Sequence, residues 1–144
     1  QPAPTWHARG APASPTPAPG PPRPRARVTL PAMRIVGGRW AGRDLASPRD
    51  WRVRPTAELV RAELMDALAD DLPGARVADL FAGTGALGLE ALSRGAWRCD
   101  FVETRPESLR ALKRNVARLG ARDRVRVFPH DALPWAARCA PDQY

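Results

Sequence analysis

The stretch that decides the fold is residues 79–90, which read DLFAGTGALGLE. It follows a short apolar run at 76–81 and opens an apolar helical pattern that continues to about Arg94 and stops at Gly95. Glycines between a strand and a helix let the backbone turn sharply and approach a ligand without a Cβ in the way. The pattern therefore predicts a strand–turn–helix unit that binds a nucleotide-like cofactor.

The alternation of predicted strands and helices continues after this unit. Residues 99–103 are typical of a second strand, and residues 124–128 alternate as a third. Between them, Pro106 opens a predicted helix that stops at Gly120. Its apolar face comprises Leu109, Leu112, Val116 and Leu119. Strands alternating with helices of this length predict an α/β fold with a parallel sheet and right-handed crossovers.

Acidic residues accompany all three strand ends. Asp79 belongs to the first strand, Glu103 ends the second, and Asp131 follows the third. Open α/β sheets bind ligands at this edge, where a carboxylate can accept hydrogen bonds from both ribose hydroxyls of an adenosine. Asp79 would repel the pyrophosphate of NAD or FAD, whereas S-adenosylmethionine carries a sulfonium and an ammonium group. The acids therefore favour S-adenosylmethionine as the cofactor. The alternative is that Glu103 and Asp131 face solvent at the start of loops and bind no ligand.

The region before the glycines predicts a helix and a small hairpin. Thr56 can cap a helix over about 57–72 that ends at Pro73-Gly74. Its predicted buried face comprises Val60, Leu64, Leu68 and Leu72. Residues 34–54 predict short strands, with a two-residue turn or a bulge at Gly37-Gly38.

Composition separates the front of the chain from the rest. The 144 residues carry a formal net charge of +8, and ten arginines against two acids in residues 1–57 account for all of it. Residues 1–32 hold 10 of the 17 prolines, which predicts a disordered leader and a folded protein that begins near Met33. A basic front end predicts a polyanionic partner, above all nucleic acid; the alternative is a solvated arginine-rich segment from a genome that favours Arg codons.

Other classes of protein are disfavoured. No run of 18 apolar residues exists, so no transmembrane helix is expected. The two cysteines, Cys99 and Cys139, lack metal-ligand spacing, which favours a reducing, cytoplasmic compartment and no metal site.

Arginines alternate with tryptophans in the predicted hairpin, where guanidinium groups fit phosphates and indoles can stack on bases. The candidate RNA-binding residues are Arg34, Arg39, Trp40, Arg43 and Arg54, with Trp51 and Arg52 beside them. Alternatively, Trp40 and Trp51 pack the hairpin onto the body.

DLFAGTGALGLEALSRGA, at 79–96, resembles motif I of class I methyltransferases in the form typical of the RsmD family, which methylates a guanine exocyclic N2 in small-subunit rRNA. MRIVGGRWAGRDL at 33–45 is similar to the family's RNA-binding hairpin. RPTAELVRAEL at 54–64 resembles its RPT segment, and FVE at 101–103 its ribose-binding strand end. The resemblance implies a Rossmann-like class I methyltransferase sheet, of which residues 56–144 supply the first three strands and residues 33–55 the basic hairpin.

The resemblance also implies site residues and partners. The expected cofactor-binding residues are Asp79, Phe81, Gly83, Gly85, Glu103, Asp131 and Ala132. Among them, Glu103 is expected to hold the ribose, and Asp131 with Ala132 the adenine. The expected partner of a monomeric protein is small-subunit rRNA or the assembling small ribosomal subunit.

The family's catalytic [DN]PP[FY] motif is expected beyond Tyr144, so no catalytic residue is assigned. We therefore expect this chain itself to be inactive. Its strand at 76–81 would be an open apolar edge, which predicts poor solubility or partial folding. The rival hypotheses are a non-catalytic RNA-binding fragment, a methyltransferase that acts on DNA or protein, and an NAD-dependent oxidoreductase.

Overall fold

The computed structural model describes residue 1 and residues 33–48, 55–140 and 143–144. Its elements are η1 (Gly38–Trp40), α1 (Pro55–Ala67), β1 (Arg76–Asp79), α2 (Ala86–Ser93), β2 (Arg98–Val102), α3 (Pro106–Leu119), η2 (Arg122–Arg124), β3 (Val125–Phe128) and α4 (Ala132–Ala136). The leader predicted for 1–32, apart from residue 1, and the predicted RNA contacts of Trp51, Arg52 and Arg54 fall outside the described residues. No helix in the described ranges is long and apolar enough to cross a bilayer.

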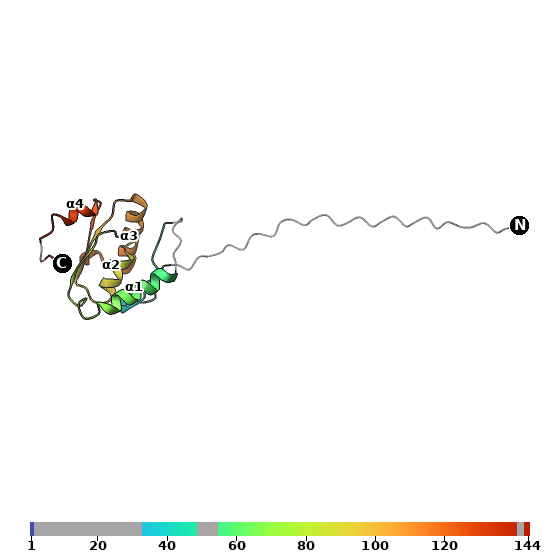
Figure 1. The fold of residues 1–144 in the computed structure, drawn as a ribbon, viewed down its shortest axis with the longest axis horizontal. Helices are drawn as coiled ribbons and strands as arrows, with labels where there is room; N and C mark the ends of the chain where they lie inside the picture. The colour runs from blue at the N-terminus through green and yellow to red at the C-terminus, as the bar shows by residue number, and fades with distance from the viewer. Residues whose placement is uncertain (2–32, 49–54, 141–142) are drawn as a thin grey trace.

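The three strands form one parallel sheet in the order β1-β2-β3, which confirms the predicted α/β fold. Val77 lies opposite Cys99, and Phe101 lies opposite Val127. Helices α1, α2 and α3 lie on one side of the strands, and α4 lies on the other (Figure 1). Within the described residues β1 is an edge strand, as expected from the sequence.

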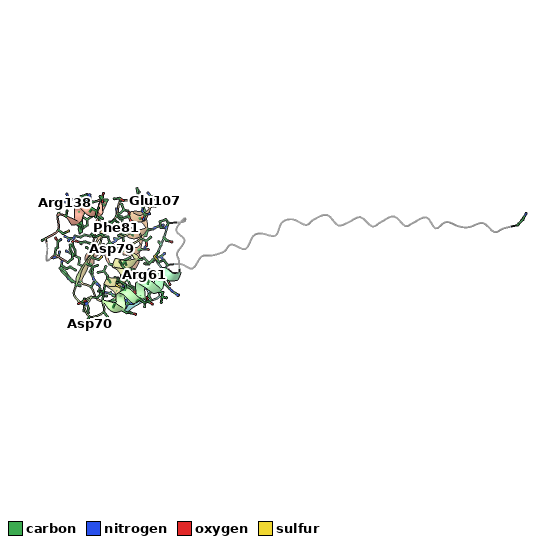
Figure 2. All side chains as sticks on the ribbon, viewed as in Figure 1. Arg61, Asp70, Asp79, Phe81, Glu107 and Arg138 are labelled. Atoms are coloured by element: carbon green, nitrogen blue, oxygen red, sulfur yellow. The ribbon has the colours of Figure 1, made fainter. Side chains whose placement is uncertain are left out.

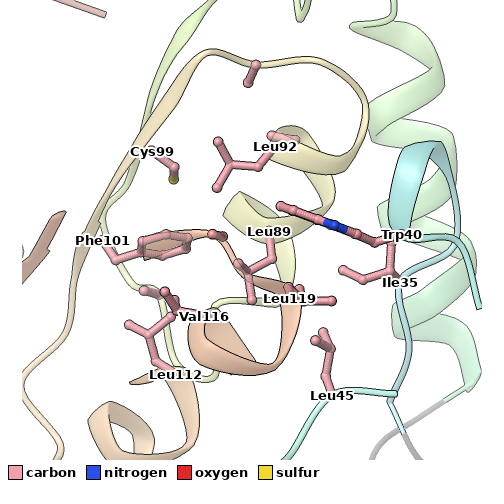
Figure 3. Close-up of a cluster of buried hydrophobic side chains, with 14 of the residues drawn as sticks. Ile35, Trp40, Leu45, Leu89, Leu92, Cys99, Phe101, Leu112, Val116 and Leu119 are labelled. Carbon is pink, nitrogen blue, oxygen red and sulfur yellow. The ribbon is translucent and has the colours of Figure 1, made fainter. Parts of the chain in front are cut away.

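The larger core lies between the sheet and helices α2 and α3. Phe101 of β2 is fully buried among Leu89 of α2 and Leu112 of α3 (Figure 3). Val102, the next residue, belongs to a second, smaller cluster with Ala132 and Trp135 on the α4 side. Because successive strand residues point to opposite faces, β2 contributes to both cores.

Helix α3 forms as the sequence predicts. Pro106 is its first residue, and Leu112, Val116 and Leu119 are buried. Gly120, at a φ of 66°, closes the helix through its N–H to the carbonyl of Ala117.

Helix α1 shows that the predicted buried face was wrong. Leu72 is buried, but Val60, Leu64 and Leu68 are all exposed. The helix instead turns Arg61 and Met65 inward. Arg61 pairs with the buried Glu90 of α2, and this polar attachment sets the rotation of the helix. Its apolar stripe therefore finds no cover within the described part of the chain.

The predicted hairpin forms as one antiparallel bridge with flanking backbone hydrogen bonds, and the short strands expected over 34–54 are not present within the described residues 33–48. Arg34 and Asp44 form an antiparallel bridge, and Leu45 donates its N–H to the carbonyl of Met33 at 2.6 Å. The chain reverses through η1, which begins at Gly38, and residues 41–42, so the turn is longer than the predicted two-residue turn at Gly37-Gly38. Gly38 lets the loop approach α2 closely, because a Cβ at this position would lie 2.1 Å from the carbonyl oxygen of Ser93. We call residues 33–46 the basic loop.

Candidate cofactor site and basic loop

A cavity of about 320 Å³ opens where the three strands end. We call it the strand-end pocket. It is lined by Leu80, Phe81, Val102, Glu103, Thr104, Arg105, His130, Asp131 and Ala132. Figure 2 places Phe81 near this end of the molecule, opposite the end that carries Asp70. The pocket thus occupies the edge at which parallel α/β sheets bind ligands.

Glu103 is the most strongly held acid in this pocket. Its Oε2 accepts the N–H of Gly83 at 2.8 Å, and its Oε1 accepts those of Thr104 and Arg105, both at 2.8 Å. Burial acts to raise its pKa, but these backbone donors outweigh burial and hold the pKa of Glu103 below its ordinary value. The carboxylate is therefore fixed and ionised, and one of its roughly four acceptor positions, on Oε2, remains for a ligand hydroxyl group.

Asp79 lies beneath the glycine-rich turn. It is 8% exposed, and its Oδ2 accepts the N–H of Gly88 at 3.1 Å. Burial, more than the nearby charge of Glu103, raises its pKa. The side chain ties the end of β1 to the first turn of α2.

The turn itself is shaped by packing. Gly85 caps α2 with a φ of 82°, and a Cβ there would lie 2.3 Å from a methyl carbon of Leu112. Thr84 beside it is buried and contacts both the basic loop and α3: its hydroxyl donates to the sulfur of Met33 at 3.6 Å, and its carbonyl accepts from Asn115 at 2.9 Å. The turn is thus built rigidly against α3 before any ligand arrives.

The predicted cofactor residues separate into two groups. Phe81, Glu103, Asp131 and Ala132 line the pocket. Asp79, Gly83 and Gly85 instead form the turn that supports it. Sequence reasoning missed other lining residues, namely Leu80, Val102, Thr104, Arg105 and His130. Their only sequence signal was position, because each lies within two residues of a predicted acid.

The basic loop is anchored on the C-terminal half of α2. Glu90, fully buried, accepts the N–H groups of Val36 at 2.8 Å and of Gly37 at 2.6 Å. It also pairs with Arg61 and Arg94. Ser93 donates to the carbonyl of Gly37 and accepts the N–H of Trp40. The helix that begins at the glycine-rich turn therefore also holds the loop.

Trp40 departs from its expected RNA-binding role. Its indole is 5% exposed and packs in the core beside Ile35 (Figure 3), so it stabilises the loop instead of stacking on a base. The guanidinium groups of Arg39 and Arg124 lie 5.0 and 5.9 Å from the ring. Arg39 and Arg43 are exposed, as a phosphate-binding role requires, whereas the exposed Arg34 pairs with Glu58 of α1 at 3.5 Å.

A parallel sheet with a glycine-rich turn after β1 and a fixed carboxylate after β2 defines a Rossmann-like fold. Solved structures named as methyltransferases share this fold, which assigns it to the class I methyltransferase type. Residues 33–143 match the family described as Conserved hypothetical protein 95, and the chain belongs to that family.

Curated relatives of this chain are named as methyltransferases. The chain is 41% identical over 106 residues to Ribosomal RNA small subunit methyltransferase D of Escherichia coli K12, which covers 74% of this chain and 53% of that protein. It is 37% identical over 87 residues to the Haemophilus influenzae protein of the same name, covering 60% and 45%. The chain thus spans about half the length of the curated relatives it matches.

Solved structures share the fold. The Escherichia coli protein yhhF superposes with a TM-score of 0.66 at 39% identity, covering 74% of this chain and 57% of that one. A hypothetical protein of Thermus thermophilus superposes with a TM-score of 0.61 at 35% identity, covering 74% and 60%.

Proposed function

We propose that this chain is the cofactor-binding part of a methyltransferase that moves a methyl group from S-adenosylmethionine to the exocyclic N2 of a guanine in small-subunit rRNA. The fixed acids of the strand-end pocket and the names of the relatives support the proposal. We place the reaction in the cytoplasm, with a monomeric protein acting on rRNA or on the assembling small subunit.

One observation carries the choice of cofactor. A dinucleotide-binding turn offers free backbone N–H groups to a pyrophosphate. In this chain, Glu103 occupies the N–H of Gly83, and Asp79 occupies that of Gly88. The protein's own carboxylates thus fill the positions where phosphate oxygens would bind. Such a site repels a pyrophosphate and suits a ligand with a sulfonium and an ammonium group.

Each residue then has a defined part. Glu103 accepts the ribose hydroxyls, and Asp131 with Ala132 faces the adenine. Asp79, Gly83 and Gly85 border the methionine moiety, and the exposed Phe81 lines the pocket. The cofactor supplies an electrophilic methyl group. Arg34, Arg39, Arg43 and Arg54 hold RNA phosphates while the target base leaves its stack.

Calorimetric titration of the 144-residue chain with S-adenosylhomocysteine and with NAD tests this proposal. We expect S-adenosylhomocysteine to bind and NAD not to bind. Glu103→Gln should weaken binding by roughly 10- to 100-fold, because a charged hydrogen-bond acceptor is lost. Glu63→Gln, which removes an exposed carboxylate on α1, is the matched control and should bind normally. Binding of NAD, or equal affinities in the two variants, would overturn the proposal.

A further inference from the structure

The folded body separates its charges although it is neutral as a whole. Residues 58–144 carry 13 basic and 13 acidic side chains. Residues 58–71, which include most of α1, hold five acids and one arginine, and that arginine, Arg61, is buried against Glu90. Residues 105–124, which contain α3 and η2, hold seven cations and two acids. The neutral sum therefore conceals an acidic helix and a basic one.

The exposed side of α3 carries a row of like charges. Arg110, Arg114 and Arg118 are exposed and follow one another at intervals of four residues, about 6 Å apart along the helix. Lys113 is exposed beside them. Like charges at this spacing destabilise a helix by a few tenths of a kcal/mol per pair. The row thus opposes the folding of α3, and an anionic partner would reverse that effect.

Within the ranges that the structure describes, no ion pair neutralises the row. The arginines that form ion pairs within the described residues are Arg34, Arg61, Arg94, Arg105 and Arg126. Arg110, Lys113 and Arg114 are not among them. Their charges are available to a partner.

The row is continuous with the basic loop. Arg118 donates to the carbonyl of Asp44 at 3.0 Å, and Asn115 exchanges hydrogen bonds with the backbone of Ala46. Arg124 lies against the ring of Trp40, close enough to Arg39 for their charges to interact. The loop and the exposed side of α3 therefore form one basic surface.

The row also leads to the strand-end pocket. Arg105, which lines the pocket, directly precedes α3, and Arg110 lies little more than one turn further along the helix. An RNA strand bound along the row would therefore pass close to the pocket in which we propose that the cofactor binds.

We propose that Arg110, Lys113, Arg114 and Arg118 bind the phosphate backbone of the substrate RNA and extend the binding surface of the basic loop to the pocket. This inference rests on the proposed function. The inference assigns RNA binding to α3, whereas the charge pattern of the sequence indicated RNA binding only for the region of the basic loop. Glu63, Asp70 and Asp71, which form no ion pair within the described residues, repel the same RNA and thereby favour one orientation.

The test compares two variants of equal charge. Arg110→Gln with Arg114→Gln removes two charges from the row, and glutamine matches arginine in helix propensity. Arg76→Gln with Arg138→Gln removes two exposed charges from β1 and from the segment after α4. Binding of a labelled RNA hairpin with an unpaired loop is measured by fluorescence anisotropy across a range of salt concentrations. A DNA hairpin of the same sequence is measured in parallel.

We expect the α3 variant to bind the RNA more weakly, with the slope of log K against log salt reduced by about 1.4 to 1.8. The control variant should keep the parent slope. Circular dichroism should show an unchanged or slightly higher melting temperature for the α3 variant, because repulsion is relieved. Equal slopes in the two variants, or tighter binding of the DNA hairpin, would overturn the inference. Binding of S-adenosylhomocysteine is measured on the same samples: its absence alongside an α3-dependent RNA slope refutes the proposed function and leaves this inference standing.

Discussion

Helices α1 and α3 are almost equal in length, at 13 and 14 residues, but different forces attach them to the body. Helix α3 presses an apolar face onto the sheet through Leu112, Val116 and Leu119. Helix α1 buries an arginine against a glutamate and leaves most of its apolar stripe in solvent. Apolar attachment depends on volume and shape, whereas the ion pair depends on a single buried charge.

An apolar stripe with helical spacing predicts that a helix forms more securely than it predicts that the stripe is buried. Both stripes have helical spacing, so both segments form helices. A stripe is buried only where another part of the protein meets it. In α1, the pairing of Arg61 with Glu90 fixes which side faces the core.

The largest effect is expected from breaking the polar attachment of α1. Glu90→Gln keeps the size of the side chain but leaves Arg61, 6% exposed, without its counter-charge. The amide also cannot accept the N–H groups of both Val36 and Gly37 in the present arrangement. We expect the free energy of unfolding to fall by about 3–5 kcal/mol, measured by urea denaturation. The exposed Glu63→Gln should change it by less than about 0.5 kcal/mol.

A milder variant keeps this prediction testable if Glu90→Gln does not fold. Ser93→Ala removes the hydrogen bonds to the carbonyl of Gly37 and the N–H of Trp40 and should lower stability by about 1–3 kcal/mol. Hydrogen exchange at the amides of Ile35 and Gly42, which bond within the basic loop, should accelerate in the same variant. Unchanged exchange would show that α2 does not anchor the loop.

A smaller loss is expected from breaking the apolar attachment of α3. Leu112→Ala empties a fully buried site beside Phe101 and should lower the free energy of unfolding by about 3 kcal/mol. Leu64→Ala, the matched change on the exposed stripe of α1, should cost less than about 1 kcal/mol. Similar losses at the two positions would mean that something covers α1 in solution.

The sequence predicts the local features of this molecule well and its long-range contacts poorly. Local signals predicted β1, β2, β3, α2 and α3 to within two residues at their ends, because glycine, proline and strand periodicity act over a few positions. They also identified Glu103, because the end of a strand is a local feature. They did not reveal that Glu90 binds the N–H groups of the basic loop more than 50 residues away. The same long-range contact explains the burial of Trp40 and the rotation of α1.

The smallest effect on stability is expected at the start of α3, where the carboxylate of Glu103 makes a pH-sensitive contact. Glu103 accepts the N–H groups of Thr104 and Arg105 just before the helix, and these donors with that of Gly83 hold its pKa below the ordinary 4.5. A lowered folded pKa means that the stability from this group is fully present above about pH 4.5 and is lost as pH falls through the folded pKa.

The contribution of Asp79 to stability changes with pH in the opposite direction. Its pKa is raised by burial, so its contribution is present below its ordinary value of 3.8 and is lost as pH rises through the folded pKa. Glu103→Gln should therefore flatten the fall in stability below about pH 4.5, whereas Asp79→Asn should make it steeper. Urea denaturation at pH steps from about 3 to about 6 measures both slopes. If Glu103→Gln keeps the acid slope of the parent chain, then the attachment of α3 does not depend on that carboxylate.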